Sequence, residues 1–194
     1  DAEDDENSTD FWIRRSRLKV KAKPTDNLKV QLYFASGEGD NTKIKNAYIQ
    51  KDLNDEGSTW FQAGRVEVPF GFDTPQSSSR RLPLERNMLS RRQIPGGMET
   101  GITFFHTSPE DQELFDYCKG NRLWGTGDAG NFAFGIYNGQ GKDYTDVDDT
   151  GKHFLLRFCK PTMMKEGSDS ERYAEAGVTY YAGEFYSEAA DEIF

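Results

Sequence analysis

The stretch that decides the fold is Phe-Trp-Ile-Arg-Arg-Ser-Arg-Leu-Lys-Val-Lys-Ala-Lys, residues 11–23. Leu18, Val20 and Ala22 alternate with basic residues, which stand at every odd position from 15 to 23. Successive side chains of a β-strand point to opposite faces, so this stretch predicts a strand with one apolar and one cationic face. Such a row of charges cannot enter an apolar core, because each unpaired charge would cost several kcal/mol. The cationic face must therefore meet water.

The same alternation continues along the chain and predicts an all-β, antiparallel protein. Pro-Thr-Asp-Asn at 24–27 is a tight turn, and residues 28–34 return with Leu28, Val30, Leu32 and Phe34 on one face. Together the two segments form a hairpin. We expect further strands at 44–51, 59–70, 99–107, 130–138, 152–160 and 172–182. This makes eight strands, and residues 113–119 are a candidate for one more.

The amino-acid composition agrees with a β-sheet that has one apolar face and one face exposed to water. The hydrophobic fraction is 35%, below the roughly 45–50% of ordinary globular proteins, while aromatic residues make up 13%. Disordered chains are poor in aromatic residues, so disorder does not explain the low hydrophobicity. The net charge of −9 argues against a nucleic-acid partner. Residues 1–10 are acidic and are expected to form a tail before a single barrel segment, 11–194.

The connections alternate in length, as in outer-membrane barrels. The turns near 24–27 and 52–57 are short, whereas 37–43, 71–98 and 139–150 are long and polar. Trp12, Trp60, Tyr180 and Tyr181 lie near strand ends, where an aromatic girdle would sit. The longest loop, 71–98, far exceeds the usual length and is expected to be functional. Its basic residues are Arg80, Arg81, Arg86, Arg91 and Arg92.

Two readings of the basic residues stay open at this point. In a barrel they would line the lumen and attract anions, with arginine suited to phosphate and carboxylate. In a soluble or surface-exposed β-sandwich they would be a solvated face with no ligand. The basic loop could fold into a lumen and narrow it, or be an exposed recognition loop. Extraction with detergent or with plain buffer would separate the barrel from the sandwich.

The sequence contains no catalytic constellation, and neither an enzyme nor a cofactor is expected. His106 and His153 stand on different strands, and the glycine-rich residues 125–130 lack the lysine and the parallel βα unit of a phosphate loop. The acidic residues 143–149 do not have EF-hand spacing, so we expect a solvated loop and no metal. Cys118 and Cys159 have no metal-binding spacing, and a disulfide between them is left open.

Several stretches in order resemble the phosphate-selective porin O/P family. They are residues 11–23, 24–34, 45–49 (Lys-Asn-Ala-Tyr-Ile), 63–71 (Ala-Gly-Arg-Val-Glu-Val-Pro-Phe-Gly), 77–79, 135–141 and 175–181. The resemblance implies a trimeric channel of the bacterial outer membrane that lets small anions such as phosphate diffuse passively and that contacts lipid or lipopolysaccharide. It implies a barrel larger than eight strands, of which this chain is the N-terminal half.

The resemblance also assigns roles to residues. Arg15, Arg17, Lys19 and Lys21 resemble the basic ladder that faces the lumen in the family. Arg65 stands where the family often has a basic or polar inward residue. Residues 71–98 correspond by position to the loop that folds into the pore. The connection around 115–129, with Cys118, is not a feature of the family pattern.

Overall fold

The computed structural model describes residues 13, 15–37, 42–76, 97–121, 123, 125–126, 129–139, 151–165 and 171–183. Its strands are β1 Arg15–Thr25, β2 Leu28–Gly37, β3 Lys43–Asp52, β4 Thr59–Glu67, β5 Met98–His106, β6 Phe132–Tyr137, β7 His153–Lys165 and β8 Glu171–Ala182. All eight form one antiparallel sheet in which each strand pairs with the next along the chain. The predicted all-β meander is confirmed.

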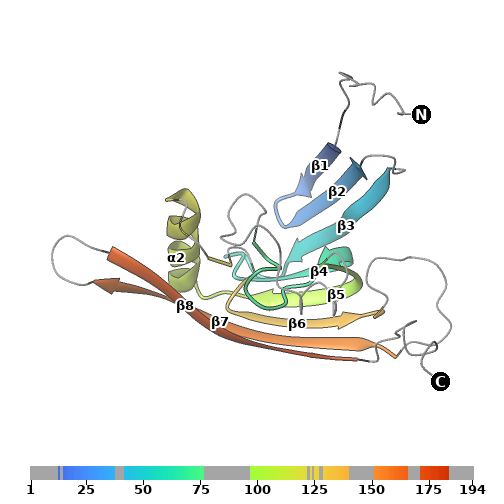
Figure 1. Cartoon of the computed structure of the whole chain (residues 1–194). Helices are drawn as coiled ribbons and strands as arrows, with labels where there is room; N and C mark the ends of the chain where they lie inside the picture. Colours follow the sequence, from blue (N-terminus) through green and yellow to red (C-terminus); the bar gives the residue numbers. More distant parts are fainter. Residues whose placement is uncertain are drawn as a thin grey trace, which may run out of the picture.

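The sheet is strongly curved and open. In Figure 1, β1–β3 rise at a steep angle to β5–β8, and the described chain between β4 and β5 lies inside the curve. Within the described residues, β1 and β8 are the two edges of the sheet and do not pair with each other. The fold is that of a porin-like barrel segment whose wall is not closed.

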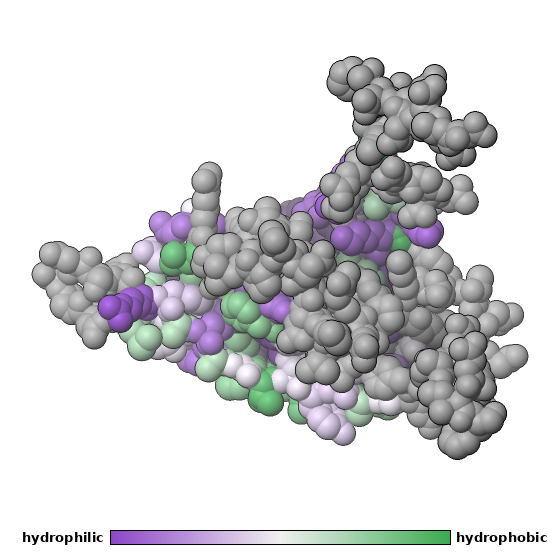
Figure 2. Space-filling view, in the orientation of Figure 1, coloured by the Kyte–Doolittle hydropathy of each residue, from purple (hydrophilic) through white to green (hydrophobic). Residues whose placement is uncertain are grey.

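One face of the sheet carries an exposed apolar belt. Register places Phe104, Phe134, Leu156 and Tyr180 in one row across β5–β8, and neighbouring rows are equally apolar. The side chains of the belt are between 36% (Phe134) and 68% (Val178) exposed. Its other large members are Leu18, Val20, Leu32, Ile44, Ile49, Ile102, Phe132, Ile136, Phe154 and Phe158. In Figure 2 some hydrophobic residues are visible along the lower edge, the side of β6–β8, among paler and more polar ones.

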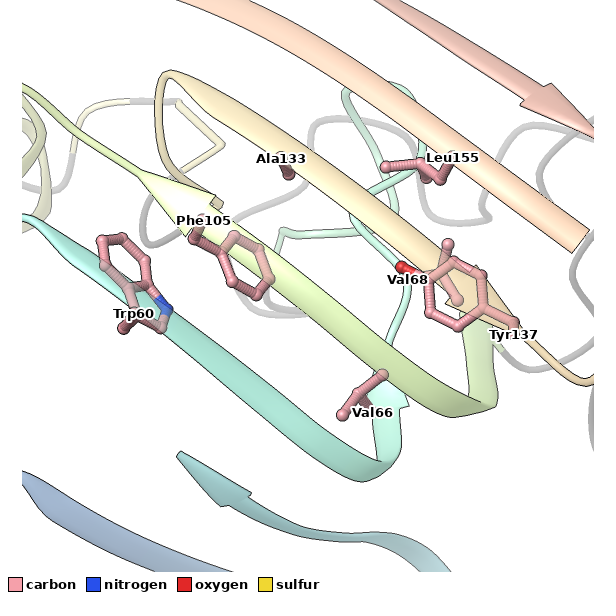
Figure 3. Packing of buried hydrophobic residues seen from close by; sticks show 7 residues of the cluster. All are labelled: Trp60, Val66, Val68, Phe105, Ala133, Tyr137 and Leu155. Carbon is pink, nitrogen blue, oxygen red and sulfur yellow. The ribbon is translucent and has the colours of Figure 1, made fainter. Parts of the chain in front are cut away.

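The opposite face carries a small buried cluster, shown in Figure 3. It consists of Trp60, Val66, Val68, Phe105, Ala133, Tyr137 and Leu155. Trp60 and Phe105 lie side by side on β4 and β5, with ring centroids 5.2 Å apart and nearly parallel planes. The expected strand 59–70 is too long, because β4 ends at Glu67 and Val68 turns away to help bury this cluster.

The aromatic girdle expected from Trp60 and Tyr181 is wrong for these two residues. Trp60 is 8% exposed inside the buried cluster, and the Tyr181 ring packs edge-on against Phe70, with centroids 5.9 Å apart. Both rings stand in rows of the inner face, because period-2 register carries them there with Phe105 and Leu155. Tyr180 does lie on the apolar belt, and Trp12 is outside the described residues.

The candidate strand at 113–119 is also wrong, since these residues lie in helix α2, Pro109–Gly120. Ser108 caps the helix: its Oγ accepts a hydrogen bond from the Asp111 backbone N–H over 3.3 Å. Pro109 at the first turn and acidic residues beside it suit a helix N-terminus. The helix packs near β7, where Lys160 Nζ lies 2.8 Å from Asp111 Oδ1. No helix in the described part of the chain is long and apolar enough to cross a membrane.

Candidate solute pathway

The inner face of the first strands is cationic. Arg17, Lys19 and Lys21 are exposed on β1 and stand opposite Ala35, Tyr33 and Gln31 of β2. The backbone of Arg15 continues this strand opposite Gly37, while its side chain is outside the described residues. The row alternates with Leu18 and Val20 of the apolar belt, so charge and hydrocarbon are on opposite faces of the same strand.

Two lysine ammonium groups, those of Lys19 and Lys45, lie over the ring of Tyr33. Lys19 Nζ lies 4.7 Å from the centroid of the Tyr33 ring, and Lys45 Nζ of β3 lies 5.3 Å from it. An exposed cation–π contact is worth about 0.5–1 kcal/mol, which offsets part of the repulsion between the two ammonium groups. The positive strip therefore extends from β1 across β2 to β3.

Below the strip lies a chain of side-chain amides. Gln62 Nε2 donates to Gln50 Oε1 over 3.1 Å, and Gln50 Nε2 donates to Asp52 Oδ1 over 3.0 Å. The other oxygen of Asp52 lies 3.2 Å from Lys29 Nζ. Gln50, Gln62 and Lys29 line a cavity of about 700 Å³ that is bounded by β1–β4 and by α2. The inner face thus combines ammonium groups with neutral donors and acceptors.

Arg157 fastens the beginning of the long loop to β7. Its Nη1 donates to the Gly71 carbonyl over 2.6 Å and lies 3.5 Å from the Pro69 carbonyl. Its Nη2 lies 3.7 Å from Glu175 Oε1, and both side chains are 3% exposed. The other end of the loop is tied by the Val68 N–H, which donates to the Gly97 carbonyl over 3.0 Å. Residues 68–76 consequently lie over the inner face of the sheet (Figure 1).

Glu175 is also the centre of a polar cluster beneath α2. It accepts hydrogen bonds from the Thr126 N–H over 3.0 Å, the Tyr173 hydroxyl over 3.0 Å and the Cys159 thiol over 2.9 Å. Cys118 of α2 and Cys159 are both buried free thiols, so the disulfide left open above is not formed here. Burial raises the pKa of the Cys118 thiol, which keeps it protonated and unreactive at neutral pH.

The other predicted site residues are placed differently. Arg65 is 7% exposed near the end of β4, and register puts it beside Ala47 and Thr100, not in the row of Lys21 and Gln31. Gly64 before it has a φ of +126°, and both Arg65 and Val66 are buried, so the alternation is broken there. The arginines expected at the constriction, Arg80 to Arg92, lie outside the described residues, as do the acidic residues 143–149.

The sequence does not predict the contacts of Arg157, Glu175 and the two histidines. In the sequence, Arg157 and Glu175 are only polar positions of alternating strands, and nothing in their spacing links them to the loop. Each histidine lies close to a hydroxyl: His106 Nδ1 is 2.9 Å from Thr59 Oγ1, and His153 Nδ1 is 2.9 Å from the Tyr181 hydroxyl. Among the described residues, no group of three His, Cys, Asp or Glu could hold a metal ion.

Comparison with known proteins gives one match. The sequence model of the family described as phosphate-selective porin O and P matches residues 1–194, the whole chain. Neither a curated protein nor a solved structure matches this chain.

Proposed function

Because the chain belongs to the phosphate-selective porin O and P family, we propose that it forms part of the wall of an anion channel in the bacterial outer membrane. Family membership supports a role as a channel and favours it over an enzymatic activity. The finer proposal is that small anions such as phosphate diffuse passively along the cationic inner face, and that the apolar belt contacts lipid or lipopolysaccharide. The wall would be completed by further strands, and three copies would assemble as a trimer.

The observation that carries this proposal is the opposite chemistry of the two faces of one sheet. Belt residues such as Phe158 and Val178 are 54% and 68% exposed, and no second layer of described residues covers them. In a β-sandwich an apolar face of this size would be packed against another sheet. In a membrane it meets hydrocarbon, while the polar face turns to water. The sandwich alternative therefore lacks its second sheet in the described part of the chain.

The inner face has the field that an anion pathway needs. Arg17, Lys19 and Lys21 follow one another at every second residue of β1, and Lys45 extends the positive strip to β3. Cations that line a narrow channel with low-dielectric walls raise the local concentration of anions and exclude cations. We propose these residues, with Arg15, as the ladder along which anions move. Arg65 enters the proposal as a buried cation close to the base of the loop.

The long loop is proposed as the constriction. Its described base lies over the inner face, held there by Arg157 and by the hydrogen bond between Val68 and Gly97. Five arginines of the loop, Arg80, Arg81, Arg86, Arg91 and Arg92, would then present forked donors to passing anions. A base that is fixed to the wall supports this role, because a constriction needs a stable position.

The proposal is tested by the ion selectivity of the purified protein. The complete protein is extracted from outer membranes with detergent and inserted into planar bilayers under a KCl gradient. The expected reversal potential is that of a chloride-selective channel, and inorganic phosphate should compete with chloride for passage. A cation-selective channel, or a protein that is released by buffer without detergent, would refute the proposal.

A further inference from the structure

The cavity of about 700 Å³ at the short-turn end of the sheet has two chemically different sides. One side is the inner face of β1–β4, and the other is α2, which contributes Gln112 and Asp116. We propose that this cavity is a binding subsite for phosphorylated polyols such as sugar phosphates. The inference rests on the proposed function, since it places the subsite in the path of the anions, and it adds a class of solute that the basic ladder alone does not select.

The phosphate end of such a solute would meet Lys21. Three lysines line the cavity, and two of them are already paired: Lys23 Nζ lies 3.6 Å from Asp26 Oδ1, and Lys29 Nζ lies 3.2 Å from Asp52 Oδ2. Lys21 has no carboxylate partner among the described residues, and it is exposed. Its charge is therefore available to a phosphate group, with which an ammonium forms charge-assisted hydrogen bonds.

The hydroxyl groups would meet side-chain amides. Gln31, Gln50 and Gln62 come from three neighbouring strands and line the same cavity. Each amide has two N–H donors and one carbonyl acceptor, and the chain from Gln62 through Gln50 to Asp52 uses only one N–H of each glutamine in it. The remaining donors and acceptors suit hydroxyls, which both donate and accept. Tyr48 also lines the cavity, beside the buried Trp60, and offers aromatic carbon to the C–H groups of a sugar ring.

The helix side separates a polyol phosphate from inorganic phosphate. Gln112 Nε2 donates to Asp116 Oδ1 over 3.2 Å, which orients the Asp116 carboxylate. A carboxylate accepts hydrogen bonds from hydroxyls and repels a phosphate ion. A solute with phosphate at one end and hydroxyls at the other satisfies both sides of the cavity at once. A bare phosphate ion satisfies only the lysine side.

The test is solute block of the chloride current through the complete protein in bilayers of phosphatidylcholine, a lipid without a polyol headgroup. Glucose 6-phosphate, inorganic phosphate and glucose are compared. We expect glucose 6-phosphate to block at a lower concentration than either of the others. Asp116→Ala should weaken its block by about tenfold, the value of one charge-assisted hydrogen bond, while the block by inorganic phosphate strengthens.

Glu113→Ala is the matched control, because Glu113 is an exposed carboxylate of the same helix that does not line the cavity. It should shift the block by both phosphates in the same direction. The isosteric Asp116→Asn replaces Asp116→Ala if the latter disturbs folding. Equal block by glucose 6-phosphate and inorganic phosphate would overturn the inference. An Asp116 variant that shifts the block by both solutes in the same direction would overturn it too. The proposed function is judged separately, from the reversal potential before any solute is added.

Discussion

At the scale of single residues, charge and close contact decide what each position can do. Lys19 is a clear case, since its ammonium group is exposed on the inner face and rests on the Tyr33 ring. Lys19→Glu should move the reversal potential measurably toward cation selectivity, because it reverses one charge within the positive strip. Lys51→Glu is the control, since register places Lys51 in the row of Leu28 and Phe61 on the other face. Equal shifts from both variants would contradict the assigned faces.

Gly135 shows how a small residue admits a large neighbour. A Cβ at this position would clash with the ring and hydroxyl of Tyr137, which folds back over it and reaches Thr103 Oγ1 over 2.8 Å. Gly135→Ala should therefore lower the free energy of unfolding by about 1–3 kcal/mol, as overpacking does. Unfolding in urea, followed by loss of β-sheet circular dichroism, measures this. Gly120→Ala, where nothing lies near the added carbon, should have little effect.

The sequence predicts the residue pattern well where alternation is strict. Phe154, Leu156 and Phe158 against His153, Arg157 and Cys159 are confirmed on opposite faces of β7 by the register with β6 and β8. Trp60 was misplaced, because an aromatic residue near a strand end suits a lipid interface as well as a buried inner cluster. Period-2 patterning cannot tell two apolar faces apart when the inner face also holds a packed cluster.

At the scale of elements, the base of the long loop depends on one arginine. Arg157→Met removes its hydrogen bonds to the Pro69 and Gly71 carbonyls and leaves Glu175 buried without its cation. Breaking a buried pair from one side costs about 3–5 kcal/mol. We expect faster proteolysis within residues 77–96 and larger current noise in bilayers.

Two controls separate loop release from general damage. Arg172→Met removes an exposed arginine from β8 and should change neither proteolysis nor noise. The double variant Arg157→Met/Glu175→Gln removes the unpaired charge but keeps an acceptor for Tyr173 and Cys159, so it should regain stability while the loop stays loose. If proteolysis of the loop is no faster in Arg157→Met than in the unchanged protein, other contacts hold the loop and Arg157 does not fix its base.

Helix α2 shows where reading the sequence as strands fails. Ser108-Pro109-Glu110-Asp111 has an N-cap, a proline in the first turn and acidic residues, all signals of a helix start. The helix buries Phe115 and Cys118 at a spacing of three, which is a helical and not a strand period. In a chain of alternating strands these signals were outweighed by the period-2 pattern around them. Ser108→Ala should lower the stability of α2 by about 1 kcal/mol, detectable as faster amide exchange there.

At the scale of the whole molecule, eight strands make a curved and open sheet with an exposed apolar belt on one face and a row of cations on the inner face of β1. The order and number of strands could be predicted, because hairpins with alternating residues specify neighbours in sequence as neighbours in space. The curvature, the loop base and α2 could not, because they depend on contacts between residues as far apart as Pro69 and Arg157. Both inner-face proposals depend on the same central claim, that the two faces of β1 meet lipid and water.

The most direct test of that claim is chemical labelling of single cysteines along β1. Residues 17 to 21 are replaced one at a time by cysteine, with Cys118 and Cys159 changed to serine, and the protein is inserted into vesicles. A charged, water-soluble thiol reagent should label positions 17, 19 and 21, whereas a lipid-soluble quencher should reach a probe at 18 and 20. Equal labelling of Leu18→Cys and Lys19→Cys by the charged reagent would contradict the account.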